Sequence, residues 1–237
     1  MLEKTEGLVL SSFKYAETSV ITKIFTRKFG LLSFMVKGAR NAKSGRGNLL
    51  QPLNFLLLDI YYREQKNLLS LKDINIDNMY PLLFTDFRRR SIAIFLVEII
   101  GKCIHERQEN KELFDFCKDT FVSLNEIQTD ITYKPLFILF EISKILGCYP
   151  NLNEGDFFDL EHGCFSMHQN YLTSGLNALE SASLRRALKL YEQPDTLIRL
   201  YPDERRQLLE KMLLYFQLHI PGFSPPNSPT ILHQILE

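Results

Sequence analysis

The spacing of apolar residues changes once along this chain of 237 residues, near Tyr80 and Pro81, and this change sets the fold class. Before it, apolar and β-branched residues alternate with polar ones, which is the period of strands. After it, apolar residues recur three and four positions apart, which is the period of helices. The sequence therefore predicts an α+β protein with a β domain over residues 1–80 and an α-helical domain over residues 81–237.

Five short segments carry the strand pattern, and they predict a small antiparallel barrel or sandwich. They are Thr5–Ser12, Thr18–Thr26, Leu31–Ala39, Leu53–Tyr62 and Leu68–Ile76. Turn residues fill three of the four intervals between them. The interval 40–50 differs, because it holds two glycines, three basic residues and no acid, and it predicts a mobile loop that leaves the sheet.

Helical spacing follows in five segments, and a short hairpin interrupts them. The predicted helices are Asp86–Glu106, Asn110–Ile127, Lys134–Leu146, Ser183–Tyr191 and Asp203–His219. Residues 157–160 and 164–167, joined by 161–163, have the pattern of two short strands. We expect a hairpin insertion within the helical domain.

Composition excludes several classes of protein. The longest apolar stretch, 92–100, is nine residues long and contains Glu98, so it predicts a buried helix and no membrane span. The first ten residues carry two acids and no signal-peptide pattern. Four cysteines without a CxxC pair fit a reducing compartment, so we expect a cytoplasmic protein.

Charge is divided unevenly, although 28 basic residues balance 28 acidic ones. Residues 1–80 hold 12 basic and 7 acidic residues, whereas residues 81–237 hold 16 and 21. Between residues 98 and 161 there are 13 acids against 6 basic residues. The zero net charge therefore averages a basic β domain and an acidic helical half, and it does not exclude a nucleic-acid ligand.

The basic residues of the β domain concentrate in residues 27–46, where no acid occurs. Cations that follow phosphates beside exposed rings are the usual means of binding single strands. Phe13, Tyr15, Phe29 and Phe34 are the nearby rings. A merely solvated charged surface is the alternative. The predicted DNA-binding residues are Lys14, Lys23, Arg27, Lys37, Arg40, Lys43 and Arg46.

Six short motifs in the first 60 residues occur in an order and spacing that resemble the amino-terminal domain of RecO, the bacterial recombination mediator. They are 5–10 (TEGLVL), 15–19 (YAETS), 24–26 (IFT), 29–30 (FG), 36–40 (VKGAR) and 51–53 (QPL). Farther along, 146–152 (LGCYPNL) adds to the resemblance. The resemblance implies an OB-fold followed by a helical domain.

The same resemblance implies a role in DNA repair and homologous recombination. Members of the family bind single- and double-stranded DNA and anneal complementary strands. They associate with RecR and with single-stranded DNA-binding protein, and they help to load RecA. Annealing needs a surface that neutralises two backbones, and it needs no cofactor, nucleophile or metal.

Many members of the family also carry a four-cysteine zinc site in the region that matches residues 150–175. Here that region contains Cys164 alone and no CxxC pair. His162, His168 and Asp159 are the other possible ligands, but their spacing does not form a zinc knuckle. We therefore expect no metal, and a hairpin held by apolar packing of Phe157, Phe158, Leu160 and Phe165.

Arginine clusters in the helical domain suggest a protein partner. Arg185, Arg186 and Arg206 are candidates for binding the acidic carboxy-terminal tail of single-stranded DNA-binding protein, because arginines beside apolar pockets recognise acidic motifs. Solvated helix faces are the alternative.

No nucleotide-binding, zinc-protease or serine-hydrolase motif occurs in the sequence, so we predict a protein that is not an enzyme. Two other functions stay open. One is an adaptor whose barrel binds RNA or a peptide. The other is an enzyme that uses Asp159, His162 and His168.

Overall fold

The computed structural model describes residues 1–41, 45–128, 130–168 and 175–229. The chain divides into two compact units, Met1–Thr129 and Asp130–Glu237, which are described in turn.

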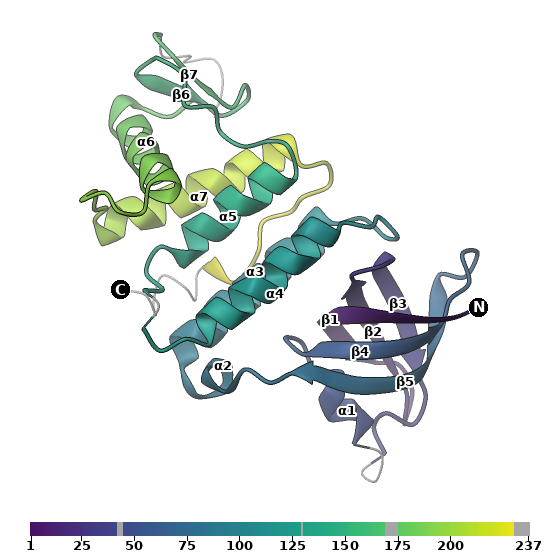
Figure 1. The fold of residues 1–237 in the computed structure, drawn as a ribbon. Helices are drawn as coiled ribbons and strands as arrows, with labels where there is room; N and C mark the ends of the chain where they lie inside the picture. Colours follow the sequence, from purple (N-terminus) through teal and green to yellow (C-terminus); the bar gives the residue numbers. More distant parts are fainter. Residues whose placement is uncertain (42–44, 129, 169–174, 230–237) are drawn as a thin grey trace. The chain divides into compact units, whose positions relative to one another are not determined.

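Five strands of the first unit close into a barrel in the order β1-β2-β3-β5-β4 (Figure 1). They are β1 (Leu2–Lys14), β2 (Val20–Thr26), β3 (Gly30–Val36), β4 (Phe55–Tyr61) and β5 (Leu68–Asn78). All neighbours are antiparallel except β3 and β5, which pair in parallel at Ser33–Leu68 and Phe34–Leu69. This is the topology of the OB-fold, and the expected fold is confirmed.

Alternate residues of each strand fill the barrel interior, as the two-residue period requires. Ile24, Phe34 and Leu58 are completely buried or nearly so in this core. Gly7 lies on the same inner face, where an added Cβ would come within 2.6 Å of Ile24 and 2.7 Å of Leu58. The barrel therefore requires a residue without a side chain at this position.

The barrel also buries apolar residues on its outer surface, and three helices of the same unit follow the barrel in sequence. They are α2 (Pro81–Thr85), α3 (Phe87–Cys103) and α4 (Lys111–Leu124). Phe114 of α4 lies edge-on to Phe25 and Phe55, with ring centroids 5.6 and 5.8 Å apart. Phe121 approaches Phe55 to 5.0 Å. Aromatic packing thus joins the barrel and α4 into one unit.

A buried arginine fixes α3 against the end of α4. The guanidinium of Arg89 donates to the backbone carbonyls of Leu124, Glu126 and Ile127 at 2.7 to 3.0 Å. Leu124 ends α4 and the other two residues follow it, so these carbonyls lack partners within the helix. The flanking Arg88 and Arg90 are exposed.

The second unit contains three helices and the predicted hairpin. The helices are α5 (Lys134–Ile145), α6 (Ala178–Glu192) and α7 (Pro202–His219), and the hairpin strands are β6 (Phe157–Asp159) and β7 (Cys164–Ser166). Helix α6 begins five residues earlier than its periodicity predicted, because Asn177 and Glu180 form a capping box at its start. The four other predicted helices lie within a few residues of their predicted bounds, whereas the short helix α2 was not predicted.

The interval 40–50 was predicted as a loop, but it contains a one-turn helix, α1 (Arg46–Leu49), between β3 and β4. Residues 42–44 lie outside the described residues. In the described part of the chain, no helix is long and apolar enough to cross a membrane. The proposed limit between a 1–80 domain and an 81–237 domain stays a prediction.

Candidate nucleic-acid interface

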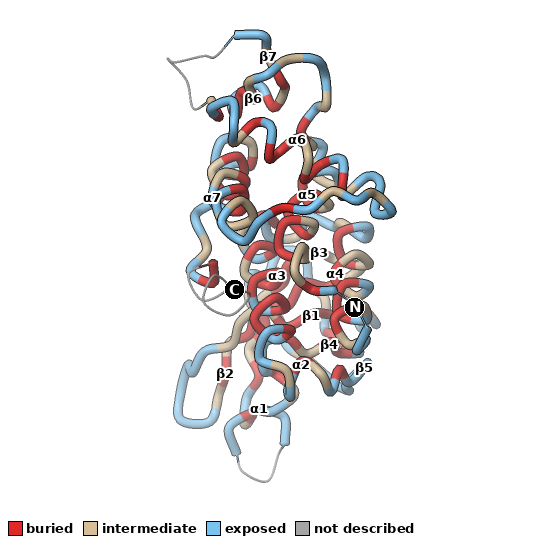
Figure 2. The backbone as a smooth tube through the Cα atoms, turned by 90° about the vertical axis from the view of Figure 1, so that its left-hand side faces the viewer, coloured by how far each residue is buried: buried red, intermediate tan, exposed pale blue. Residues whose placement is uncertain are grey.

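Strand register brings two predicted cations to one end of the barrel. Lys14 pairs with Val20, and Val20 pairs in turn with Val36, so Lys14 and the residue after β3, Lys37, lie at the same end. Both side chains are exposed, as is most of the β1–β2 turn, which is pale blue beside β2 in Figure 2. Neither lysine has an ion-pair partner among the described residues.

Arg40 lies at the same end and contacts the β1–β2 turn, residues 15–19. Its guanidinium Nη1 donates to the carbonyl oxygens of Ala16 at 3.3 Å and Glu17 at 2.8 Å. Its backbone N–H donates to the carbonyl of Thr18 at 3.1 Å. The turn itself closes with a hydrogen bond from Tyr15 N–H to the Ser19 carbonyl.

Helix α1 adds a further cation to this end. The hydroxyl of Ser12 donates to the carbonyl of Leu50, which ties the end of α1 to β1 near Lys14. Gly47 lies so close to the backbone of Ala39 that an added Cβ would come within 2.8 Å of the Ala39 oxygen. The exposed Arg46 is therefore held beside the segment that carries Lys37 and Arg40. We call Lys14, Lys37, Arg40 and Arg46 the basic end; Lys43 lies outside the described residues.

Lys23 lies on the outer face of β2, away from the barrel interior. Its direct neighbours across the strands are Ser11 of β1 and Ser33 of β3, so no acid lies opposite it. Two residues closer to the basic end, Phe13, Ile21 and Met35 share the same outer face. This strip of two lysines and apolar side chains connects Lys23 to Lys37.

Of the four aromatic rings that the sequence suggested for stacking on bases, two are exposed at the basic end. Phe13 is 48 % exposed and Tyr15 is 60 % exposed, and they flank Lys14 at the basic end. Phe34, in contrast, is completely buried in the barrel core and cannot contact a base. Phe29 stacks on Tyr62 with 4.3 Å between ring centroids, at the opposite end of the barrel.

Arg27 and Lys28 lie at that opposite end, in the β2–β3 turn, and both are ion-paired. The guanidinium of Arg27 holds both carboxylate oxygens of Asp115 on α4, at 2.8 and 2.9 Å. The hydrogen bond to Arg27 lowers the pKa of Asp115 below its ordinary value. Lys28 pairs with Glu3. The acid-free segment 27–46 is therefore divided between a paired end and a basic end.

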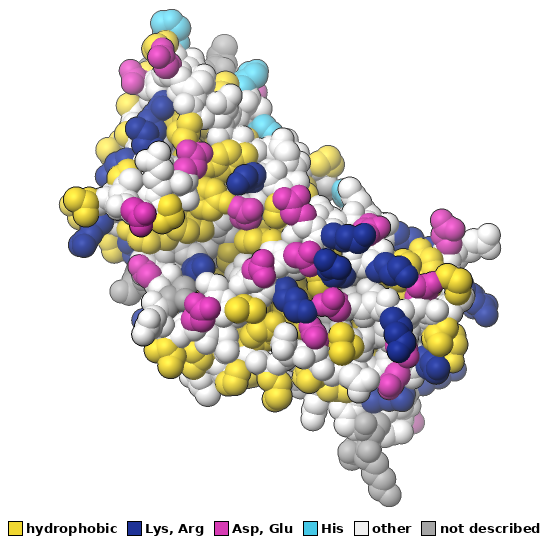
Figure 3. Space-filling view, in the orientation of Figure 1, with side chains coloured by type: hydrophobic (Ala, Val, Ile, Leu, Met, Phe, Trp, Pro, Cys, Tyr) yellow, Lys and Arg dark blue, Asp and Glu magenta, His cyan; other side chains and the backbone are white. Residues whose placement is uncertain are grey.

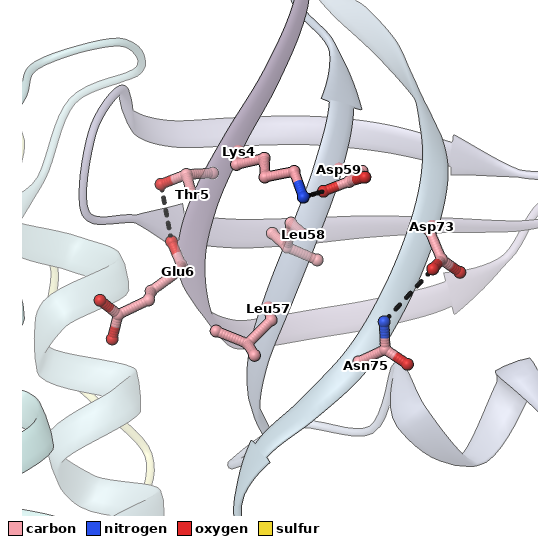
Figure 4. Close-up of a pocket in the computed structure, with 8 residues that line it drawn as sticks. All are labelled: Lys4, Thr5, Glu6, Leu57, Leu58, Asp59, Asp73 and Asn75. Atoms are coloured by element: carbon pink, nitrogen blue, oxygen red, sulfur yellow. Dashed lines mark hydrogen bonds and ion pairs between the residues drawn. The ribbon is translucent and has the colours of Figure 1, made fainter.

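The outer surface of β1, β4 and β5 carries several acids beside its cations, so it suits phosphate poorly. Its depression of about 420 Å³ is lined by Lys4, Glu6, Asp59 and Asp73 among others (Figure 4). Asp59 and Asp73 lie directly opposite each other, with Lys4 3.9 Å from Asp59. Figure 3 shows cations and acids intermixed over this side of the barrel and α4. The barrel thus has a basic end without ion pairs among its described lysines, and an outer face over β1, β4 and β5 where cations lie beside acids.

The hairpin of the second unit is held by packing and hydrogen bonds. Phe158 and Phe165 are buried, with ring centroids 5.0 Å apart. Asp159 accepts hydrogen bonds from the backbone of Glu161 and His162 and from the His162 ring. Among the described residues, no group of three or more His, Cys, Asp or Glu side chains is placed to hold a metal ion.

The three candidate partner-binding arginines all have contacts inside the second unit. Arg185 donates to the carbonyls of Asn153 and Gly155, and its guanidinium lies 3.8 Å from the centre of the Phe165 ring. Arg186 pairs with Glu204. Arg206 pairs with the exposed Asp203 at 2.9 Å. The sequence could not show that Arg185 supports the hairpin.

A closed OB-fold barrel with cations and exposed rings at one end is an architecture of nucleic-acid-binding proteins. Residues 1–80 match the family model described as recombination protein O N terminal, and residues 85–228 match recombination protein O C terminal. The chain belongs to the RecO family of DNA repair proteins.

Similar proteins cover the whole chain. The DNA repair protein RecO of Phocaeicola vulgatus is 31 % identical over 99 % of both chains. That of Flavobacterium johnsoniae is 30 % identical over 98 % of both chains. That of Porphyromonas gingivalis is 25 % identical over the full length of both.

Proposed function

We propose that this RecO-family protein binds single- and double-stranded DNA through the basic end of its barrel and the adjoining Lys23. The observation that carries the proposal is the convergence of Lys14, Lys37 and Arg46 at one end, with no ion-pair partner for them among the described residues. Such cations neutralise phosphates by releasing counterions, independently of sequence. We leave Arg27 out of this set, because Asp115 occupies its guanidinium.

The two exposed rings suit a single strand. Phe13 shares the outer face of the barrel with Lys23, and Tyr15 begins the turn directly after Lys14, so a strand held by these two lysines would pass both rings. Stacking leaves the hydrogen-bonding edges of the bases accessible to a second strand. This arrangement supports annealing of complementary strands, without an enzymatic step.

The wider role rests on the family to which the chain belongs. We propose that the protein acts in the cytoplasm with RecR and single-stranded DNA-binding protein and helps to load RecA onto coated DNA. For the acidic tail of single-stranded DNA-binding protein, Arg206 is the best of the three candidates, because its exposed pair with Asp203 costs little to open. Titration of a labelled acidic tail peptide against the parent protein and R206A tests this contact.

Annealing of two complementary oligonucleotides at increasing salt tests the function as a whole. We expect faster annealing with protein than without it at low salt, and loss of the effect as salt rises. The same assay with a structured RNA competitor addresses the adaptor alternative. A protein that prefers the RNA, or that leaves the annealing rate unchanged at every salt concentration, would contradict the proposal.

A further inference from the structure

Within the basic end, Arg40 differs from the other three residues because its guanidinium donates hydrogen bonds to the protein backbone. Three consecutive carbonyls of the β1–β2 turn, those of Ala16, Glu17 and Thr18, accept hydrogen bonds from this single residue. The hydrogen bonds to Ala16 and Glu17 come from the same guanidinium nitrogen, so the side chain is directed at the turn.

The backbone around Arg40 fixes that direction. Ala39 is 2 % exposed and belongs to the barrel core, so the segment is anchored immediately before Arg40. Gly38 has φ of +68°, a left-handed conformation that side chains disfavour, and its carbonyl accepts from the Asn41 N–H. The chain thus turns sharply at 38–41 and presents Arg40 to residues 16–18.

The turn that Arg40 holds carries other parts of the proposed DNA site. Tyr15 begins the turn and Lys14 precedes it, while Lys37 lies three residues before Arg40. Without the Arg40 side chain, the β1–β2 turn would keep the Tyr15–Ser19 hydrogen bond but lose two of the three contacts that connect it to the segment after β3, leaving only the backbone hydrogen bond from residue 40 to Thr18.

We propose that Arg40 is a positioning residue: it clamps the β1–β2 turn to the segment after β3, and thereby sets Lys14 and Tyr15 relative to Lys37, instead of contacting a phosphate itself. This inference rests on the proposed DNA-binding function and assigns one of its residues a different task. An arginine suits the task because it can donate several hydrogen bonds from a planar, always charged group.

A phosphate contact and a positioning clamp can be distinguished by how the DNA affinity of a variant depends on salt concentration. Removing a phosphate contact lowers the slope of log K against log salt by about 0.7 for a single strand. Removing a clamp lowers the fraction of molecules with the turn in place, and that factor is the same at every salt concentration. Substitution of a positioning residue therefore lowers log K by the same amount at every salt concentration and leaves the slope of log K against log salt unchanged.

The experiment measures oligo-dT binding from low to moderate salt for the parent protein, R40A, R40K and K37A. We expect R40A to lose about tenfold in affinity, the order expected for hydrogen bonds from a charged donor, with the slope unchanged. R40K should lose affinity as well, although it keeps the charge, because the lysine side chain is one bond shorter and its ammonium does not reach the position from which Nη1 donates to Ala16 and Glu17. K37A should lower the slope. The proposal would be overturned if the salt dependence of R40A had the reduced slope expected for K37A. It would also be overturned if R40K bound oligo-dT with the affinity of the parent.

Hydrogen exchange of the DNA-free protein gives a second readout that does not depend on binding. We expect faster exchange of the residue 40 amide, which donates to the Thr18 carbonyl across the clamp, in R40A and R40K than in the parent, and no change in K37A. Unchanged exchange in R40A would overturn the clamp. If the parent protein failed to bind oligo-dT while R40A showed faster exchange, the DNA site would be wrong and the clamp would stand.

Discussion

The ring of Phe121 on α4 meets the ring of Phe55 on β4 edge-on, with 5.0 Å between centroids and 84° between planes. Both side chains are completely buried, and Phe114 and Tyr80 complete the same aromatic cluster. This contact makes the barrel and the helices that follow it one folding unit.

Loss of the Phe121 ring should destabilise the first unit strongly. We expect F121A to lower the free energy of unfolding by about 3 kcal/mol or more, because it removes a buried aromatic ring and leaves a cavity. V122A, on the exposed side of the same helix, is the control and should change stability little. Denaturant unfolding followed by circular dichroism measures both; equal effects of the two substitutions would contradict the packing described.

The same packing predicts how fragments behave. A fragment of residues 1–80 leaves Leu8, Phe25 and Phe55 without the helices that follow, whereas a fragment of residues 1–128 keeps α3 and α4. We expect the longer fragment to unfold cooperatively and the shorter one to bind a hydrophobic dye or aggregate. A cooperatively folded 1–80 fragment would show that the barrel does not need its helices.

Arg89 should matter far more than its two arginine neighbours. We expect R89A to lower the free energy of unfolding by about 2 to 3 kcal/mol, since it leaves three carbonyls at the end of α4 without their donor. R90A, an exposed change on the same helix, is the matched control. Similar melting temperatures for R89A and R90A would show that the carbonyls find other partners.

Stability of the second unit should fall in acid through Glu204. Partial burial acts to raise the pKa of Glu204, but hydrogen bonds from Tyr201 N–H and Ser183 and the Arg186 cation outweigh it, so the pKa lies below the ordinary value of 4.5. A lowered folded pKa stabilises the fold above the unfolded pKa, and this stability is lost as pH falls through the folded value.

We therefore expect E204Q, which keeps a capping side chain, to be less stable than the parent at neutral pH by about 1 kcal/mol and to show a flatter decline below pH 4.5. E154Q, at an exposed position, is the control. Parallel pH profiles for E204Q and the parent would rule out this contribution.

The hairpin should not depend on a metal ion. Phe158 packs on Phe165, and the guanidinium of Arg185 lies over the Phe165 ring, so we expect a chelator to leave the melting temperature unchanged. R185A should loosen the hairpin and increase protease cleavage within residues 153–168. Stoichiometric zinc in the purified protein, or melting that shifts with the chelator, would refute this.

Much of the fold could be predicted from sequence because strand and helix periods are local signals. The register of the strands is not local, and register is what places Lys37 at the same end of the barrel as Lys14 and away from Arg27. The pairing of Arg27 with Asp115 joins residues far apart in the chain, so no sequence pattern indicates it. Two signals were available and missed: the Asn177–Glu180 capping box, and the consecutive apolar Phe55 and Leu56, which indicate a strand covered on both faces.

The most direct test of the account compares the salt dependence of oligo-dT binding for two quadruple variants of equal charge. One removes Lys14, Lys23, Lys37 and Arg46, and the other removes the exposed cations Lys4, Lys72, Arg90 and Lys111 outside the basic end. For about four phosphate contacts we expect a parent log–log slope near −3, retained by the second variant and reduced toward zero by the first. Equal slopes for the two variants would contradict the assignment of the basic end as the DNA site.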